Sequence, residues 1–162
     1  MTTSVRSGKE EGTQVPIQVL NGANLGRLGS REPEIYGLTS YAQLKVLCES
    51  AGAHLGIAVD VLQTDAESEL LGWLHQAADA GDAVLLNPGG WAHTSVALGD
   101  ACASLTGPLV EVHLTNIYAR EPFRRHSYVS AHADGVICGL GVDGYLLGLR
   151  WLAAHGGVEP RG

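Results

Sequence analysis

Short apolar runs recur along the chain, separated by longer stretches in which apolar residues return at helical spacing. Runs bounded by turn residues predict strands, whereas a period near 3.6 residues predicts amphipathic helices. Strands are therefore expected at 15–20, 57–62, 83–86, 109–114 and 136–140. Helices are expected at 40–54, 67–80, 95–105 and 142–155. Strands and helices thus alternate over most of the chain.

Two of the expected helices carry boundary signals. Ser40 is followed three residues later by Gln43, which is the spacing of a capping box, and Gly81 stops the helix over 67–80. Apolar residues at helical spacing mark the first helix at Leu44, Leu47, Ala51 and Leu55. Those of the second helix are Leu70, Leu71, Leu74 and Ala78.

Alternating strands and helices, with strands that are mostly apolar on both faces, are typical of an α/β domain with a covered parallel sheet. Five strands favour a flavodoxin-like order with helices on both faces of the sheet. No repeat or linker divides the folded part, so we expect a single domain over 15–156. Residues 1–14 are expected to form a disordered tail and residues 157–162 a flexible one.

The charge balance restricts the class of ligand. Ten Lys and Arg residues face seventeen Asp and Glu, and the formal charge of -7 disfavours nucleic acid as a partner. Basic residues concentrate in only two places, where arginines occupy positions 27 and 31 and positions 120, 124 and 125. Such local clusters favour a small anionic ligand.

Cysteines and the N-terminal composition indicate the compartment. Cys48, Cys102 and Cys138 show no CxxC spacing and no framework of pairs, so reduced core thiols are expected. The first fourteen residues lack an apolar core and read as neither a signal peptide nor a membrane anchor. The expected location is the cytoplasm, with no membrane partner.

The expected topology brings polar residues to one edge of the sheet. Ligands of such sheets bind beyond the carboxyl ends of the strands, beside the reversal of strand order. Asn21 and Asn24 follow the first strand, Asn87 follows the third, and Glu111 and His113 end the fourth. Residues two apart in a strand share a face, so Glu111 can hold His113 in one tautomer. The other interpretation is that Glu111 and His113 form a buried, hydrogen-bonded pair that has no catalytic role.

Histidine placement also bears on metal binding. His93 lies at the entry to the helix over 95–105, where it either serves the site or merely accompanies the helix cap. A metal held by His93, Glu111 and His113 is disfavoured, because an acid and its orienting carboxylate would leave too few ligands. The other histidines show no ligand spacing and are His54, His75, His126, His132 and His155.

The glycine-rich loop 21–37 is the most distinctive segment of the chain. Besides its glycines it carries Asn24, Arg31 and Tyr36, which a simple connection does not need. Tyrosine side chains are poor bases at their reference pKa of about 10, but arginines packed nearby favour the phenolate. The loop therefore predicts a lid that carries a tyrosine base under positive potential, opposite a histidine acid.

Two classes of chemistry are disfavoured by absent motifs. The loop contains neither a Walker motif nor GxGxxG spacing, which weakens a phosphate-binding interpretation. Lysine occurs only at Lys9 in the expected tail and at Lys45 on an expected helix. Catalysis through a lysine imine is therefore not expected.

Four stretches of the chain resemble the type II 3-dehydroquinate dehydratases, in that family's order and spacing. They read VLNGANLGRLGSREPEIYG, LLNPGGWAHTSVAL, EVHLTN and AREPFRRHS, and the resemblance covers about Pro16 to His155. The departures are Ala23, where proline is common, the bulky Trp91, Gly99 in place of a larger side chain, and a longer tail before Val15. These bear on loop stiffness and assembly rather than on the reaction.

The resemblance implies a hydro-lyase that converts 3-dehydroquinate to 3-dehydroshikimate in the shikimate pathway, without metal, flavin or nucleotide. It implies that Tyr36, assisted by Arg31, removes the proton beside the ketone, and that Asn24 holds a water that stabilises the enolate. His113, oriented by Glu111, would then protonate the departing hydroxyl.

Further residues would hold the substrate and complete the site. Asn87 and the backbone at Leu114 and Thr115 would bind the substrate carboxylate. His93 and Arg124 would hold ring hydroxyls, and Arg120 would organise the lid and the pocket entrance. The family also implies a homododecamer of four trimers, in which Asp100 reaches into a neighbouring subunit's site.

Two other classes of function remain open at this point. A non-enzymatic flavodoxin-like module that binds flavin or nucleotide is suggested by the fold class and the glycine-rich loop alone. A scaffold subunit without activity is suggested by the apolar surface that an assembly requires. Bound flavin would favour the first, and an unaffected Tyr36→Phe variant would favour the second.

Overall fold

The computed structural model describes residues 15–156, so both expected tails lie outside the described residues. The strands are β1 (Ile17–Asn21), β2 (Val59–Gln63), β3 (Ala83–Asn87), β4 (Leu109–His113) and β5 (Gly135–Cys138). The α-helices are α1 (Pro33–Tyr36), α2 (Tyr41–Leu55), α3 (Glu67–Ala80), α4 (Val96–Ala103) and α5 (Asp143–His155). Every expected strand and helix is present, with ends displaced by a few residues.

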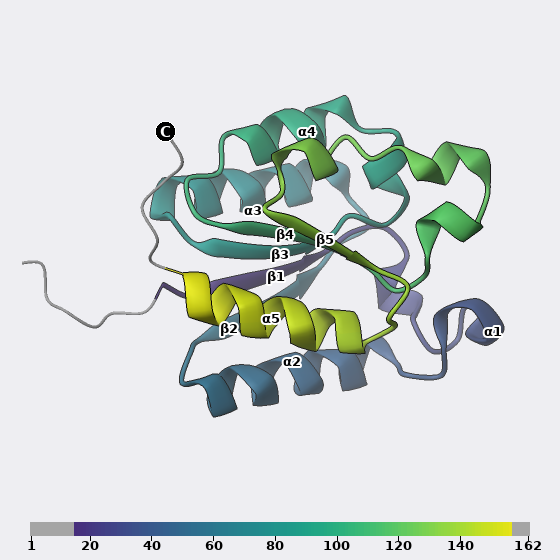
Figure 1. Ribbon diagram of the computed structural model, residues 1–162, viewed down its shortest axis with the longest axis horizontal. Helices are drawn as coiled ribbons and strands as arrows, with labels where there is room; N and C mark the ends of the chain where they lie inside the picture. Colours follow the sequence, from purple (N-terminus) through teal and green to yellow (C-terminus); the bar gives the residue numbers. More distant parts are fainter. Residues whose placement is uncertain (1–14, 157–162) are drawn as a thin grey trace, which may run out of the picture.

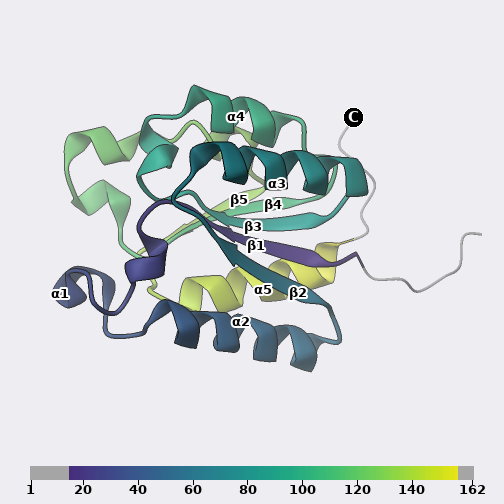
Figure 2. The same ribbon diagram turned by 180° about the vertical axis from the view of Figure 1, so that it is seen from behind.

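The five strands form one parallel sheet in the order β2-β1-β3-β4-β5. This order confirms the predicted flavodoxin-like α/β class. Helices α2 and α5 cover one face of the sheet, while α3 and α4 cover the other (Figures 1 and 2). The strand order reverses between β1 and β3, and the chain leaves both strands at the same edge of the sheet.

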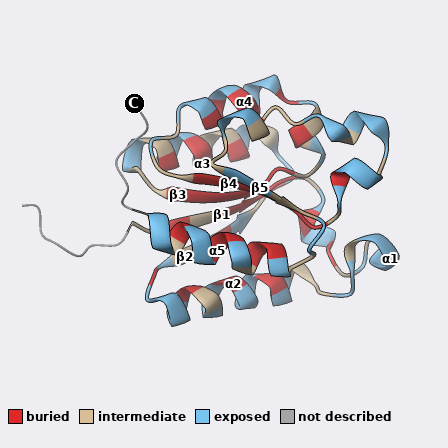
Figure 3. Cartoon of the chain, in the orientation of Figure 1, coloured by how far each residue is buried: buried red, intermediate tan, exposed pale blue. Residues whose placement is uncertain are grey.

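The core lies in two layers, one on each face of the sheet (Figure 3). All five residues of β3 are buried, which is the expected pattern for a central parallel strand. The edge strand β5 is more exposed, and Val136 retains 40% of its accessible surface. Sheet and helices thus form a rigid platform whose loops can carry the chemistry.

The register places polar side chains at the carboxyl edge of this platform. Asn21 of β1 lies opposite Asn87 of β3, and Glu111 of β4 lies opposite Leu86. Paired residues in a parallel sheet point to the same face. The two asparagines therefore lie on the α2–α5 side, whereas Glu111 and His113 lie on the α3–α4 side.

The predicted signals at helix ends are confirmed. Ser40 and Gln43 form both hydrogen bonds of the capping box, at 3.1 and 2.9 Å. Gly81 ends α3 in the left-handed conformation, with φ of 75°. Local sequence was sufficient here because the interacting residues are neighbours in the chain.

The predicted apolar stripe of α2 is only partly correct. Leu47 and Leu55 are exposed, and the helix instead buries Leu44, Cys48 and Gly52. A Cβ at Gly52 would lie 2.4 Å from Val59 Cγ2, so only glycine lets α2 approach β2 this closely. The helix is therefore rotated toward its small residues, a feature that hydrophobic spacing alone does not reveal.

The segments between strands and helices contain further short structure. The glycine-rich loop 21–37 folds into a 3₁₀ turn at Leu25–Arg27 and the short helix α1, which starts at Pro33 and stops before Gly37 with φ of 87°. The other 3₁₀ turns lie at Gly89–His93, Ile117–Ala119, Pro122–Arg125 and Ser130–His132. Within 15–156, no helix has the length and apolar character needed to cross a membrane.

Candidate active site

A cavity of about 180 Å³ opens at the carboxyl edge of the sheet. Most of the predicted site residues line it, namely Asn24, Arg31, Tyr36, Asn87, His93, His113, Leu114, Thr115, Arg120 and Arg124. Glu111 lies behind His113, and Asp100 is exposed on α4 and does not line this cavity. A larger hollow of about 650 Å³ lies at the opposite edge, beside Trp151 and His155, and contains none of the predicted site residues.

Glu111 and His113 form a directly bonded pair at the end of β4. Nε2 of His113 lies 2.8 Å from Oε1 of Glu111, and the Glu111 side chain is fully buried. Burial by itself raises the pKa of Glu111, but hydrogen bonds from His113, Ser127 and Ser130 outweigh it and hold that pKa below its usual value. Glu111 is thus a carboxylate that receives Nε2–H and leaves Nδ1 of His113 for a substrate.

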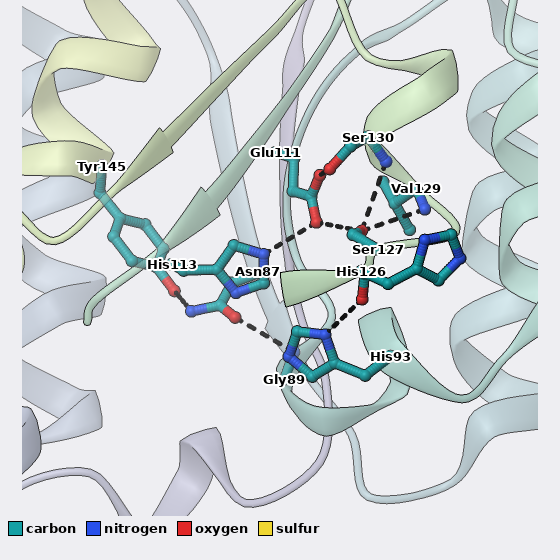
Figure 4. A network of polar contacts seen from close by, with 10 residues as sticks. All are labelled: Asn87, Gly89, His93, Glu111, His113, His126, Ser127, Val129, Ser130 and Tyr145. Carbon is teal, nitrogen blue, oxygen red and sulfur yellow. Dashed lines mark hydrogen bonds and ion pairs between the residues drawn. The ribbon is translucent and has the colours of Figure 1, made fainter. Parts of the chain in front are cut away.

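Ser127 and Ser130 complete the surroundings of this carboxylate (Figure 4). The Ser127 hydroxyl donates to Oε1 at 2.6 Å, and the Ser130 hydroxyl donates to Oε2. Sequence reasoning missed both serines as site residues, although Ser127 falls within the stretch AREPFRRHS. Serines in an irregular segment carry no spacing signal, so only the folded chain shows where their hydroxyls point.

Tyr36 lies beneath two arginines at the mouth of the cavity. Its phenolic oxygen accepts a hydrogen bond from Nη1 of Arg120 at 2.9 Å. The guanidinium carbons of Arg31 and Arg120 lie 4.9 and 5.3 Å from the centre of its ring. Positive charge from both arginines thus lies against the Tyr36 side chain. Arg120 belongs to the second arginine cluster of the sequence, so that cluster does reach Tyr36 in the folded chain.

Asn87 is held by a buried tyrosine that the sequence analysis did not single out. Nδ2 of Asn87 donates to the Tyr145 hydroxyl at 2.7 Å, and that hydroxyl donates to Oδ1 of Asn21 at 2.6 Å. Oδ1 of Asn87 accepts from the backbone N–H of Gly89 at 3.1 Å. Burial raises the pKa of Tyr145 far above its usual value, so its hydroxyl remains a neutral donor. These contacts fix which way the Asn87 amide faces.

His93 lines the cavity, and Ser95 rather than His93 caps α4. Nδ1 of His93 lies 2.7 Å from the carbonyl oxygen of His126, so it carries the proton in the neutral ring. Burial lowers the pKa of His93 below its usual value. Its ring stacks on that of His113, with centres 6.0 Å apart. Nε2 of the neutral His93 is then free to accept from a substrate hydroxyl.

The remaining polar residues frame the entrance. Nε of Arg124 donates to Glu121 at 2.8 Å, and Arg125 is exposed outside the cavity. Asn24 adopts φ of 70°, and its backbone N–H donates to Asp65 at 2.8 Å, a contact that sequence reasoning also missed. This left-handed turn lets the chain reverse directly after β1 and return toward the cavity.

Among the described residues, neither a cluster of metal-ligating side chains nor a lysine lines the cavity. Within 15–156, no group of three His, Cys, Asp or Glu side chains is arranged to hold a metal ion. Lys45 lies on α2, where it is exposed and pairs with Glu49 at 3.9 Å, away from the cavity. The cavity brings together tyrosine and histidine side chains, which can transfer protons, with arginine guanidinium and asparagine amide groups.

The fold and cavity define a flavodoxin-like α/β protein with an acid–base site at the switch in strand order. Residues 15–153 match the profile of the family described as dehydroquinase class II. The chain is 67% identical over 139 residues to the 3-dehydroquinate dehydratase of Salinispora arenicola, covering 86% of this chain and 97% of the relative. It is 57% identical over 146 residues to that of Mycobacterium tuberculosis, covering 90% and 99%.

A solved structure agrees with these relatives. The type II dehydroquinase from Propionibacterium acnes superposes with a TM-score of 0.84 at 52% identity, covering 86% of this chain and 96% of that one. The chain belongs to the class II dehydroquinase family.

Proposed function

We propose that this chain dehydrates 3-dehydroquinate to 3-dehydroshikimate in the shikimate pathway. The observation that supports it most is that one cavity holds a tyrosine suited to act as a base and a histidine suited to act as an acid. Tyr36 lies under the guanidinium groups of Arg31 and Arg120, and His113 is bonded to a buried carboxylate. Elimination of water from a carbon next to a carbon acid requires one base and one acid.

In the first step, the Tyr36 phenolate removes a proton from the carbon beside the ketone. The C–H electrons move into the carbonyl, which gives an enolate. Arg31 and Arg120 each place positive charge against the Tyr36 ring, and Arg120 also donates a hydrogen bond to its phenolic oxygen. Asn24, which lines the cavity at the start of the glycine-rich loop, would hold the water that donates to the enolate oxygen.

In the second step, the enolate collapses and forms the ring double bond. The bond to the hydroxyl on the adjacent carbon breaks, and protonated His113 supplies the proton that makes the leaving group water. Glu111 stabilises the charged ring in the orientation that leaves Nδ1 for this transfer. Tyr36 finishes protonated and His113 neutral, so one proton must pass from the first to the second through solvent before the next cycle.

The other cavity residues would hold the anionic substrate. Asn87 keeps one amide hydrogen after its bond to Tyr145, and together with the backbone N–H groups near Leu114 and Thr115 it would bind the carboxylate. His93 and Arg124 would contact the ring hydroxyls. The arginines attract an anion locally, whereas the net negative charge of the chain disfavours a large polyanion.

The proposal extends to assembly as a homododecamer of four trimers. Val96 and Asp100 lie one turn apart on α4, and both are exposed. An exposed apolar residue beside a carboxylate supports contact of this face with a second subunit, whose site Asp100 would enter. The free thiols of Cys48, Cys102 and Cys138 support a reducing cytoplasmic location.

Purified chain mixed with 3-dehydroquinate tests the reaction directly. The product contains a carbonyl conjugated with the new double bond, so ultraviolet absorbance should grow in proportion to enzyme concentration. Substrate without protein and quinate, which lacks the ketone, serve as controls. No absorbance growth from folded protein would contradict the proposed function.

A further inference from the structure

The buried carboxylate of Glu111 receives hydrogen bonds from one short segment of chain. Ser127 donates to Oε1 at 2.6 Å and Ser130 donates to Oε2, while His113 approaches Oε1 from β4 (Figure 4). Within 15–156, these are the hydrogen bonds present at this carboxylate. Two of the three come from hydroxyl groups that the proposed reaction does not otherwise use.

The Ser127 hydroxyl is oriented and not merely nearby. Its oxygen accepts from the backbone N–H groups of Val129 and Ser130 at 3.2 and 3.3 Å. A hydroxyl has one proton, and an oxygen that already accepts two hydrogen bonds can direct that proton only outward. The backbone turn therefore aims the Ser127 proton at Glu111.

The segment that carries both serines is itself anchored. Val129 is fully buried in the layer beneath α4, and the N–H of Tyr128 donates to the carbonyl of Ala92 at 2.9 Å. Gly99 of α4 is buried against it, and a Cβ there would lie 2.7 Å from the Tyr128 carbonyl oxygen. This contact gives a packing reason for Gly99, which departs from the family pattern.

The same segment also orients the second histidine of the cavity. The carbonyl oxygen of His126 accepts the Nδ1 proton of His93, whose ring stacks on that of His113. One stretch of five residues, 126–130, therefore bonds to the orienting carboxylate and to the neighbouring imidazole. We call it the serine clamp.

The other ionisable groups near Glu111 do not replace these donors. Cys102 of α4 and Cys138 of β5 face Glu111, and burial raises the pKa of each thiol, that of Cys102 to about 12. Both thiols are therefore neutral, and His93 bonds to the backbone instead. Without the serines, the carboxylate would keep only the bond to His113, and a buried charge with unmet hydrogen bonds is costly.

We propose that Ser127 and Ser130 are positioning residues that hold the Glu111 carboxylate, and through it the His113 ring, ready to protonate the leaving hydroxyl. This inference rests on the proposed function. Loss of either hydroxyl raises the pKa of Glu111, because each hydrogen bond favours the ionised form. The acid-side fall of kcat then occurs at a higher pH than in the wild type.

Alanine substitutions in the full chain test the serine clamp. Ser127→Ala and Ser130→Ala should each lower kcat by about tenfold, a loss of the size seen when a hydrogen bond that orients a functional side chain is removed. The change in KM should be smaller. The double variant should lose more and should show the upward shift of the acid limb. Ser130→Thr keeps the hydroxyl and should recover most of kcat.

Ser104→Ala is the matched control, because this hydroxyl donates to the Ala101 carbonyl at the end of α4, remote from the cavity. Wild-type kcat and pH profile in both single variants would overturn the proposal. So would equal losses in Ser104→Ala, or a Ser130→Thr variant no better than Ser130→Ala. Should the double variant fail to fold by circular dichroism, the single variants decide, since each keeps one donor.

A spectrum separates this inference from the proposed function. In the histidine side-chain ¹H–¹⁵N spectrum, the proton of His113 shared with Glu111 should resonate downfield and should move upfield in each serine variant. An inactive wild type that shows this change would contradict the dehydratase proposal and retain the clamp. An active wild type whose His113 signal is unaffected by the substitutions would contradict the clamp alone.

Discussion

The phenolic oxygen of Tyr36 accepts a hydrogen bond from Nη1 of Arg120 at 2.9 Å, although 84 residues separate them in sequence. This contact joins the glycine-rich loop 21–37 to the arginine-bearing segment after β4. Arg120 also lies 3.5 Å from the Thr115 hydroxyl, at the exit of β4. The same guanidinium thus contacts both the tyrosine of the loop and the residue that follows β4 by two positions.

Replacing Arg120 should therefore lower kcat, and not only weaken substrate binding. Arg120→Ala removes both the hydrogen bond to Tyr36 and a positive charge beside its ring, so kcat should fall roughly tenfold to hundredfold. Steady-state kinetics of the variant measures this loss. Arg125→Ala is the control, because Arg125 is exposed outside the cavity and its loss should leave kcat near the wild-type value. Equal effects of the two substitutions would contradict the assigned role.

Tyr145→Phe should disturb substrate binding from a position that no substrate atom reaches. The phenylalanine fills the same space but leaves Nδ2 of Asn87 and Oδ1 of Asn21 without their shared partner. We expect a loss of about 1–3 kcal/mol in the free energy of unfolding, the cost of leaving a buried polar group unsatisfied. KM should rise, because the Asn87 amide is no longer fixed.

Denaturant unfolding and kinetics on the same preparations check this prediction. Tyr118→Phe provides a control, since Tyr118 is 55% exposed and its loss should alter neither quantity. A Tyr145→Phe variant with unchanged KM and unchanged stability would show that the network does not orient Asn87.

Glu111 should contribute to the pH dependence of stability. Its pKa is lower in the folded chain than its ordinary value of 4.5, because the hydrogen bonds from His113, Ser127 and Ser130 outweigh the effect of burial. A depressed carboxyl pKa stabilises the fold above the unfolded value, and this contribution is lost as the pH falls through the folded value. The wild type should thus lose stability on acidification below about pH 4.5.

Glu111→Gln removes the titration, so its unfolding free energy should depend less on pH in that acidic window. Denaturant titrations at several pH values measure the slope. Glu34→Gln, which changes an exposed carboxylate, should keep the wild-type slope. Identical slopes for wild type and Glu111→Gln would mean that Glu111 is not held ionised by its neighbours.

Local patterns sufficed for much of the fold and for part of the site. The spacing of Ser40 and Gln43 predicted the capping box, and the two-residue spacing of Glu111 and His113 predicted their shared face, because strand and helix geometry fix both relations. The alternation of strands and helices likewise predicted the sheet edge at which Asn24, Asn87 and His113 meet.

Contacts between distant, irregular segments could not be predicted in this way. Tyr145 occupies an apolar helix and looks like an ordinary core residue until α5 is packed against β1 and β3. Ser127 and Ser130 follow no periodicity, and their donor directions depend on the turn that holds them. The exposure of Leu47 depends on the close packing of Gly52 against Val59.

The central claim is that Tyr36 is the base that removes the proton beside the ketone. Tyr36→Phe keeps the aromatic ring beside Arg31 and Arg120 but removes the phenolic oxygen that would accept the proton. The direct test compares wild type and Tyr36→Phe in the 3-dehydroquinate absorbance assay, with substrate binding measured by calorimetry and folding by circular dichroism. The account predicts a folded variant that binds substrate but has lost about 10²-fold or more of kcat. A folded Tyr36→Phe variant with wild-type turnover would contradict it.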